Sequence, residues 1–208
     1  MGQKVDPRSF RLQITKAWSS NWFAPKTEFK KWLLQDVKIR EFIEKKYSDR
    51  PTIAGIRIER SHNLATVTIA TAKAGVIIGR GGVGVNELKV ELEKIVGMPV
   101  RIDIEEVKKP ELSAKLVAEN IAAQLARRIN FRRATKMAAQ STMAAGAKGI
   151  RIEVSGRLNG AEMSRSERLI EGSVPLHTLR ADVDFYVARS QTVAGIVGVK
   201  VWIYKGEK

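Results

Sequence analysis

The stretch AGVIIGRGGVGVNELKVELEKIVG, from Ala74 to Gly97, places glycine at positions 79, 81, 82 and 84, between a short apolar run and a helical pattern. Glycine costs backbone entropy, so such a cluster indicates positive φ angles or a very close approach of the backbone to a partner. A phosphate group is a common partner of a glycine-rich loop at a helix N-terminus. Phosphates belong to dinucleotides, nucleotides and RNA alike, so the residues around the loop have to distinguish between them.

The segment Gly79-Arg80-Gly81-Gly82-Val83-Gly84 satisfies the dinucleotide-binding pattern G-x-G-x-x-G, with acidic residues about twenty positions further on. That fold needs a long buried strand running directly into the first glycine, and only Val76-Ile77-Ile78 is available here. A P-loop is excluded, because Val85-Asn86 follows the last glycine in place of Lys-Ser or Lys-Thr. A nucleotide-cofactor enzyme remains as an alternative of a different functional class, which tight binding of NAD or NADP would support.

The order of the surrounding elements favours an RNA-binding fold instead. Hydrophobic periodicity predicts a helix over Glu28–Tyr47, strands over Ile53–Arg60 and Leu64–Ala72, a short helix over Ala74–Ile78, a longer helix that Gly97 caps, and a strand from Val100. The order αββααβ, with GXXG between the two consecutive helices, is that of a type II KH domain, whose loop clamps the backbone of about four nucleotides. We therefore predict that Gly79, Arg80, Gly81 and Gly82 bind RNA, with Arg80 adding a charge-assisted bond to a phosphate.

The charge balance also favours nucleic acid as the partner. The 208 residues include 37 lysines and arginines against 22 acidic residues, which gives a formal net charge of +15. A field of that sign attracts polyanions. An acidic membrane surface would be attracted too, but no apolar run approaches the ~20 residues of a membrane-spanning helix. The N-terminus also lacks the apolar core of a signal peptide, so we expect a soluble protein without a membrane partner.

Few residues are available for catalysis or for metal binding. The chain has no cysteine, which excludes disulfides and thiolate metal sites. Its two histidines, His62 and His177, lie far apart, and neither has a metal-ligand companion at helical spacing. We predict no catalytic residue, no metal and no cofactor, and therefore a protein that is not an enzyme.

The first 27 residues show neither helical nor strand periodicity and are predicted to be a basic N-terminal arm. Its aromatic residues either pack on the body of the protein or lie against RNA, and both are compatible with the sequence. The basic residues that we expect to contact rRNA are Lys4, Arg8, Arg11 and Lys16. Residues 28–107 form the predicted KH domain.

Lys108-Lys109-Pro110 marks the predicted start of a second α+β domain over residues 108–208. An alanine-rich helical stretch runs from Leu112 to about Ala145, where Asn130 could divide it into two helices. Apolar residues then alternate with period two around 150–154, 181–187 and 197–203. The pattern predicts two helices packed on a mostly antiparallel sheet.

One helical region of this second domain contains basic residues but no aspartate or glutamate. Between Glu119 and Glu153 there is no acidic residue, and the basic ones are Arg127, Arg128, Arg132, Arg133, Lys136, Lys148 and Arg151. On a continuous helix Arg128, Arg132 and Lys136 would form one ridge, whereas a break at Asn130 would place Arg132 in a first turn, where the helix macrodipole opposes a positive charge. Solvated faces usually mix both signs, so we favour a contact with a polyanion, which a planar guanidinium suits.

Several motifs together resemble a known family over essentially the whole chain, the bacterial-type small ribosomal subunit protein three. They are the opening Met1-Gly2-Gln3-Lys4-Val5, the GXXG loop, Phe131-Arg132-Arg133-Ala134-Thr135-Lys136, and the stretches Gly149–Glu162 and Val174–Asp182. The resemblance implies a structural protein in the head of the small subunit of cytoplasmic ribosomes, bound to rRNA beside proteins ten and fourteen. Gln13 and Asn159 depart from the family pattern, because they stand where glycine is expected.

The resemblance further implies a position at the mRNA entrance channel with small-subunit proteins four and five. There the family uses basic residues matching Arg132, Arg133 and Lys136 to grip mRNA and to help open downstream duplexes, and we add Arg128 to this set as a candidate. Since no nucleotide-hydrolysing motif is present, any unwinding would be passive. A free-standing KH regulator of mRNAs is a further alternative, which sedimentation with small subunits would exclude.

Overall fold

The structure, a computed structural model, describes residues 4–47, 52–61 and 63–207. Met1-Gly2-Gln3 of the opening motif and His62 lie outside the described residues. The chain divides into two compact units, of which one is Trp18–Lys108 and the other combines Met1–Ala17 with Lys109–Lys208. The segment 1–27 is thus shared between the two units.

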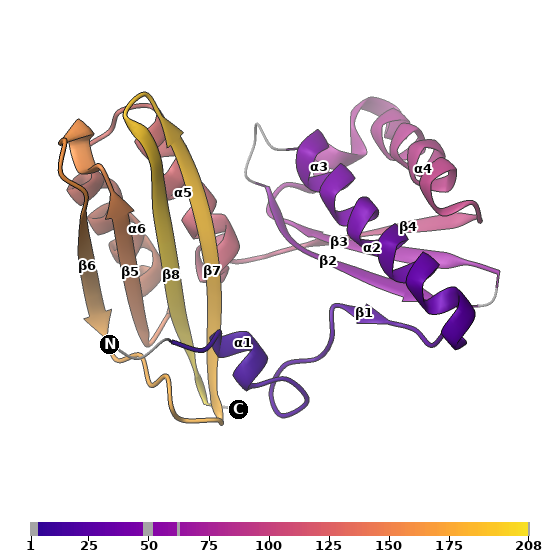
Figure 1. The fold of residues 1–208 in the computed structure, drawn as a ribbon, viewed down its shortest axis with the longest axis horizontal. Helices are drawn as coiled ribbons and strands as arrows, with labels where there is room; N and C mark the ends of the chain where they lie inside the picture. Colours follow the sequence, from indigo (N-terminus) through magenta and orange to yellow (C-terminus); the bar gives the residue numbers. More distant parts are fainter. Residues whose placement is uncertain (1–3, 48–51, 62, 208) are drawn as a thin grey trace. The chain divides into compact units, whose positions relative to one another are not determined.

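The unit Trp18–Lys108 is a four-stranded sheet with helices α2 (Lys26–Lys46) and α4 (Val83–Val96) packed against it (Figure 1). The strands in spatial order are β1 (Ser20–Asn21), β2 (Ile53–Arg60), β3 (Ala65–Thr71) and β4 (Val100–Glu106). Strands β2 and β3 are antiparallel, while β4 runs parallel to β3 because α3 (Ala74–Ile78) and α4 form the crossover. This is the predicted type II KH order, which is confirmed.

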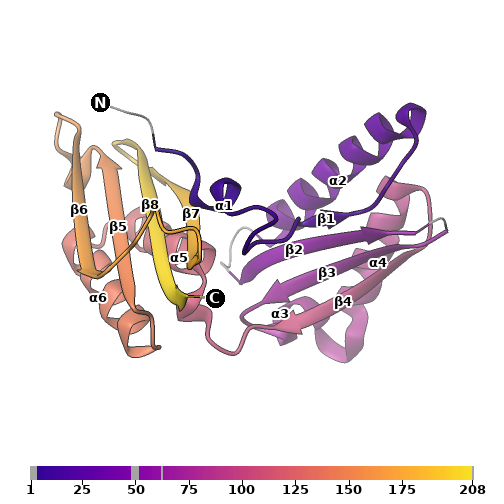
Figure 2. The same ribbon diagram turned by 90° about the horizontal axis from the view of Figure 1, so that it is seen from below.

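The core of this unit follows from the alternation along its strands. Val67 and Ile69 of β3 point toward the helices and pack with Ile39 of α2 and Leu88 of α4. The short β1, which the periodicity did not predict, pairs in parallel with the outer edge of β2, beside which it lies in Figure 2. The sheet and helices hold the glycine-rich loop at the junction of α3 and α4.

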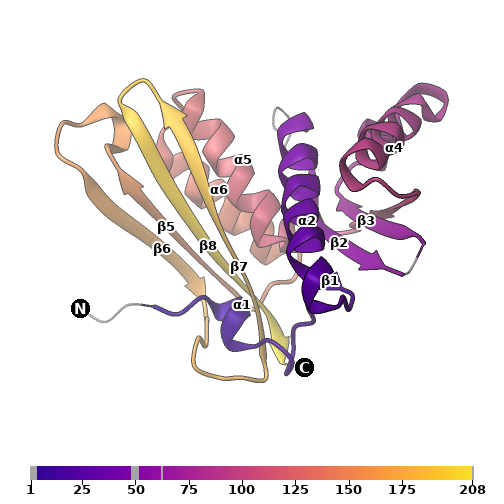
Figure 3. The ribbon, with the colours of Figure 1, turned by 45° about the vertical axis from the view of Figure 1, so that its right-hand side comes forward.

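The other unit contains a second four-stranded sheet, in which every neighbouring pair is antiparallel. Its strands in spatial order are β6 (Arg165–Gly172), β5 (Gly149–Gly156), β8 (Gly195–Glu207) and β7 (Ala181–Thr192). Helices α5 (Ala114–Ala126) and α6 (Phe131–Ala144) cover one face, as Figure 3 shows. Ile150, Ile152, Val199 and Val201 pack under them, which confirms the predicted helical pair on an antiparallel sheet.

Asn130 divides the helical stretch, which decides between the two arrangements left open by the sequence. Helix α5 ends at Ala126, and the side chain of Asn130 caps α6 by accepting a hydrogen bond of 3.0 Å from the Arg132 amide. Arg128 lies between the helices with φ of 63°. The ridge of Arg128, Arg132 and Lys136 on one continuous helix is therefore not formed.

The N-terminal segment packs on the face of the second sheet that lies opposite α5 and α6. Helix α1 (Pro7–Phe10) contacts β7, and Arg11 follows it. The Arg11 side chain is fully buried and donates hydrogen bonds to the carbonyl oxygens of Pro7 (3.1 Å), Pro175 (3.2 Å), Leu176 (3.1 Å) and Thr178 (2.8 Å). Arg11 is thus an internal anchor, which corrects its predicted role as an RNA-contacting residue of the arm.

Candidate nucleic-acid interface

The GXXG loop lies between α3 and α4 with its backbone open to solvent. Gly81, at φ of 63°, has no atom within 4 Å of the position that a β-carbon would occupy. The side chain of Arg80 is exposed beside it. Gly82 precedes α4 without a side-chain cap, so no side chain competes there for the amides that begin the helix. The loop can therefore receive a sugar-phosphate backbone in direct contact with its main chain.

Gly84 serves a different purpose from the loop glycines. A β-carbon at this position would lie 2.7 Å from the carbonyl oxygen of Ile77, so the residue lets α3 and α4 approach closely. Val76-Ile77-Ile78 belongs to α3 and is not a strand. The buried strand that a dinucleotide fold requires before its first glycine is thus replaced by a helix, which makes the G-x-G-x-x-G match coincidental.

Three basic residues are exposed along one side of α6, namely Arg132, Arg133 and Lys136, and we call this surface the basic face of α6. Arg132 and Arg133 belong to the first turn, where the macrodipole opposes their charge. Arg128 is also exposed but precedes the helix. Within the described part of the chain, neither Arg133 nor Lys136 forms an ion pair.

Arg132 differs from these neighbours because it has an acidic partner on β6. Its Nε and Nη2 atoms donate to the two carboxylate oxygens of Glu167 at 3.3 and 3.2 Å. The hydrogen bonds and the charge of Glu167 raise the pKa of the Arg132 guanidinium above its ordinary value. The Arg132 side chain nevertheless remains 72% exposed, so it can still reach a ligand from solvent.

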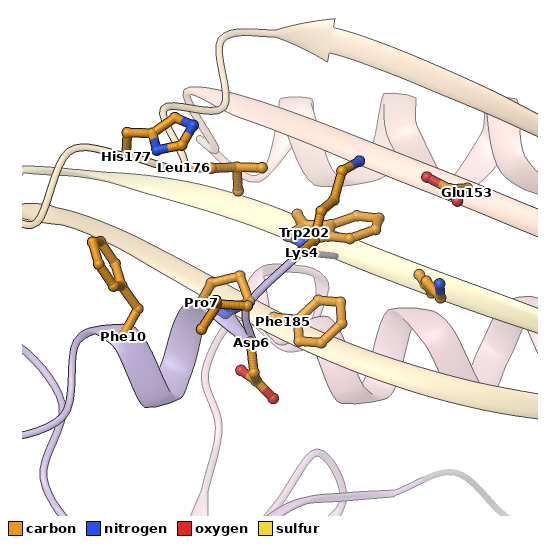
Figure 4. A pocket seen from close by; sticks show the side chains of 11 residues that line it. Lys4, Asp6, Pro7, Phe10, Glu153, Leu176, His177, Phe185 and Trp202 are labelled. Atoms are coloured by element: carbon orange, nitrogen blue, oxygen red, sulfur yellow. The ribbon is translucent and has the colours of Figure 1, made fainter. Parts of the chain in front are cut away.

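The basic residues of the N-terminal segment have unequal access to a ligand. Lys4 is exposed and lies 5.9 Å from the centre of the Trp202 ring, beside a cavity of about 400 Å³ seen in Figure 4. Arg8 is half exposed and pairs with Asp6 at 3.1 Å. Lys16 pairs with Asp182 at 2.6 Å and is largely buried. Lys4 and Arg8 are therefore the more accessible of the predicted arm residues.

The motif Val174–Asp182, which carried part of the resemblance, holds the N-terminal segment to the second unit. Three of its carbonyl oxygens accept hydrogen bonds from Arg11, and Asp182 pairs with Lys16. Burial lowers the pKa of Arg11, an effect that the nearby carboxylate of Asp182 opposes. Periodicity gave no sign of this arrangement, because a carbonyl cradle depends on backbone direction and not on side-chain type.

Two further observations concern functions that the sequence argued against. None of the helices formed by the described residues is long and apolar enough to cross a membrane. The same residues contain no group of three or more histidine, aspartate or glutamate side chains arranged to hold a metal ion.

A GXXG loop in a type II KH fold, joined to a second unit with an exposed basic helix face, defines an RNA-binding protein of the KH class. A family model described as "KH domain" matches residues 38–112, and one described as "Ribosomal protein S3, C-terminal domain" matches residues 121–203. The chain belongs to the family of small ribosomal subunit protein uS3, as its relatives show. The predicted family is thus confirmed.

The similarity to relatives extends over the full chain. The chain is 55% identical over 207 residues to small ribosomal subunit protein uS3 of Desulforudis audaxviator, covering 100% of this chain and 94% of that protein. The protein of the same name from Shewanella loihica is 54% identical over 207 residues, covering 100% and 90%. That from Pediococcus pentosaceus is 53% identical over 207 residues, covering 100% and 92%.

Membership of this family confirms the coarser functional predictions. The protein is a structural constituent of the small ribosomal subunit, associates with rRNA and takes part in translation at cytoplasmic ribosomes. It is not an enzyme, because the family consists of ribosomal structural proteins. The alternatives of a nucleotide-cofactor enzyme and of a free-standing KH regulator are accordingly excluded.

Proposed function

We propose that the basic face of α6 contacts mRNA at the entrance channel of the small subunit. The observation that carries the proposal is the exposure of Arg132, Arg133 and Lys136 on one helix within a stretch that has no acid from Glu119 to Glu153. Adjacent positive charges repel one another, so an exposed face of a single sign is stabilised when a polyanion lies against it.

The chemistry of this face suits a strand that must keep moving. Guanidinium and ammonium groups bind phosphates without reading bases, so each contact can pass to the next nucleotide. A narrow path lined by such groups favours a single strand over a duplex, and translocation supplies the force that separates the strands. The protein positions mRNA in this scheme and assists unwinding passively. Arg128, exposed just before α6, extends the same path.

The remaining contacts that we propose are structural. The exposed GXXG loop, Gly79, Arg80, Gly81 and Gly82, binds an RNA backbone, and Lys4 and Arg8 contact rRNA. Lys16 contacts rRNA through the 25% of its side chain that stays exposed beside Asp182. Arg11 is left out of this set because its guanidinium is already occupied by four carbonyl oxygens. In line with the family resemblance, the neighbours are small-subunit proteins ten and fourteen in the head and proteins four and five at the entrance.

Replacing Arg132, Arg133 and Lys136 together by alanine tests the channel role. The matched control removes the same charge from exposed positions of α2, with Lys30, Lys31 and Lys38 replaced by alanine. We expect the α6 variant to enter small subunits normally, as measured by sedimentation, and to translate structured mRNA more slowly than unstructured mRNA relative to the control. Equal translation of both mRNAs by the two variants would contradict the proposal.

A further inference from the structure

Glu167 is the acidic side chain that pairs with the basic face of α6, through Arg132. It comes from the edge strand β6, opposite Val154 of β5, and its carboxylate lies 3.2 Å from Arg132 and 3.4 Å from Arg165. A groove of about 270 Å³ between α6 and the sheet is lined by Arg132, Lys136 and Arg168, with Glu167 as its single acidic lining residue.

The geometry of the pair occupies part of the surface that a phosphate would use. Glu167 takes the edge of the guanidinium formed by Nε and Nη2, which is one of the edges suited to a bidentate bond with a phosphate. The Glu167 side chain is 32% exposed and the Arg132 side chain 72% exposed, so an RNA strand that approaches from solvent reaches Arg132 more easily than Glu167. The pair is neutral as a whole, although the face around it is positive.

We propose that Glu167 is an internal counter-ion that competes with RNA phosphates for Arg132 and keeps this contact weak and rapidly exchanged. The inference rests on the proposed mRNA contact of α6 and deepens it. A phosphate that binds the Nε edge must displace the carboxylate, and when the phosphate leaves, the carboxylate returns. Arg132 thus exchanges one anion for another without passing through an unpaired state, which favours movement of the strand along the face.

Replacing Glu167 by glutamine tests the inference while keeping the shape of the side chain. Exposed ion pairs are weak, so we expect the full-length E167Q protein to bind single-stranded oligouridine about two- to five-fold more tightly than the parent. In the parent, the displaced carboxylate takes up a cation from solution, so the phosphate contact of Arg132 releases no net counterion, whereas the same contact in E167Q releases one. The slope of log affinity against log salt should therefore steepen by about 0.7.

Glu171 provides the matched control, because it lies on the same strand and forms no ion pair in the described structure. E171Q changes the net charge by the same amount and should leave the affinity and its salt slope close to those of the parent. A double-mutant cycle with R132A completes the design, since E167Q should lose the part of its effect that acts through Arg132 once Arg132 is absent, and only the smaller effect of freeing Arg165 should remain.

The outcomes separate this inference from the function on which it rests. If R132A binds oligouridine as tightly as the parent with the same salt slope, the RNA contact of α6 itself is wrong. If R132A weakens binding but E167Q equals the parent, or binds more weakly because the carboxylate orients the arginine, only the counter-ion inference is overturned. An equal gain for E171Q would also overturn it, because the effect would then be one of net charge.

Discussion

Replacing Arg11 by alanine distinguishes an internal anchor from an RNA-binding arm. The side chain is fully buried, and its guanidinium joins helix α1 to the turn that contains Pro175, Leu176 and Thr178 through hydrogen bonds of 2.8 to 3.2 Å. Alanine would leave these carbonyl oxygens without their donor and would open a space the size of the lost side chain. The N-terminal segment would lose three hydrogen bonds to the carbonyl oxygens of residues 175–178.

The expected loss of stability follows from the number of these bonds. Hydrogen bonds from a charged donor contribute about 1.5–3 kcal/mol each, but bonds to one group are not additive and water can reach part of the vacated site. We therefore expect R11A to lower the free energy of unfolding by about 3–4 kcal/mol, near the upper end for a single substitution. For a chain of this size the corresponding fall in melting temperature is roughly 10 °C.

Thermal and urea unfolding, followed by circular dichroism, provide the measurement. R11K should recover little of the loss, because an ammonium group cannot span carbonyl oxygens that a guanidinium fork reaches together. Arg8 serves as the control, since its side chain is 50% exposed and R8A should change stability by less than about 0.5 kcal/mol. If R11A were as stable as R8A and lost RNA affinity with a shallower salt dependence, the anchor interpretation would be refuted.

Substitutions at three other sites test the packing that positions the interface. Asp36 and Arg60 form a buried ion pair at 2.5 Å, and the Asp36 carboxylate also accepts a hydrogen bond of 2.8 Å from the Trp22 indole. D36A should therefore lower the free energy of unfolding by about 3–5 kcal/mol, as urea unfolding would measure. The double variant D36L/R60M should retain most of the stability, because it leaves no unpaired buried charge. G84A should cost about 2 kcal/mol by driving a β-carbon against the Ile77 carbonyl, and an unchanged melting temperature would mean that α3 and α4 are not packed as described. Asn159 has φ of 54°, so N159G should leave stability unchanged or raise it by up to about 1 kcal/mol, while N159V should lower it, as differential scanning calorimetry would show.

Local patterns predicted most of the KH unit because its elements are amphipathic. Strand β2 has the predicted bounds, Ile53–Arg60, and so does α3, Ala74–Ile78. Each of these elements buries one face, so the apolar residues recur with the period of the secondary structure. Gln13 and Asn159, noted as departures from glycine, have positive φ angles of 67° and 54°, so the turns are retained without glycine.

Strand β6 was not predicted, and Glu167 was missed with it. The sequence Arg165–Gly172 is rich in charge, as befits an edge strand that packs on the core mainly through Leu169, so it carries little alternation of apolar residues. The pairing of Arg132 with Glu167 spans thirty-five positions and depends on β6 lying beside α6. No spacing rule within the sequence relates these two residues.

The sequence by itself determined the two α+β units, the GXXG loop, the acid-free basic helix and the family, because periodicity, glycine and charge are local properties of the chain. Only the tertiary structure decided which of the basic residues are available. Arg11 is enclosed by carbonyl oxygens, Arg132 is paired but exposed, and Arg133 and Lys136 are exposed without a carboxylate partner in the described part of the chain. The availability of a charge depends on the groups that folding brings around it, and those groups come from distant parts of the chain.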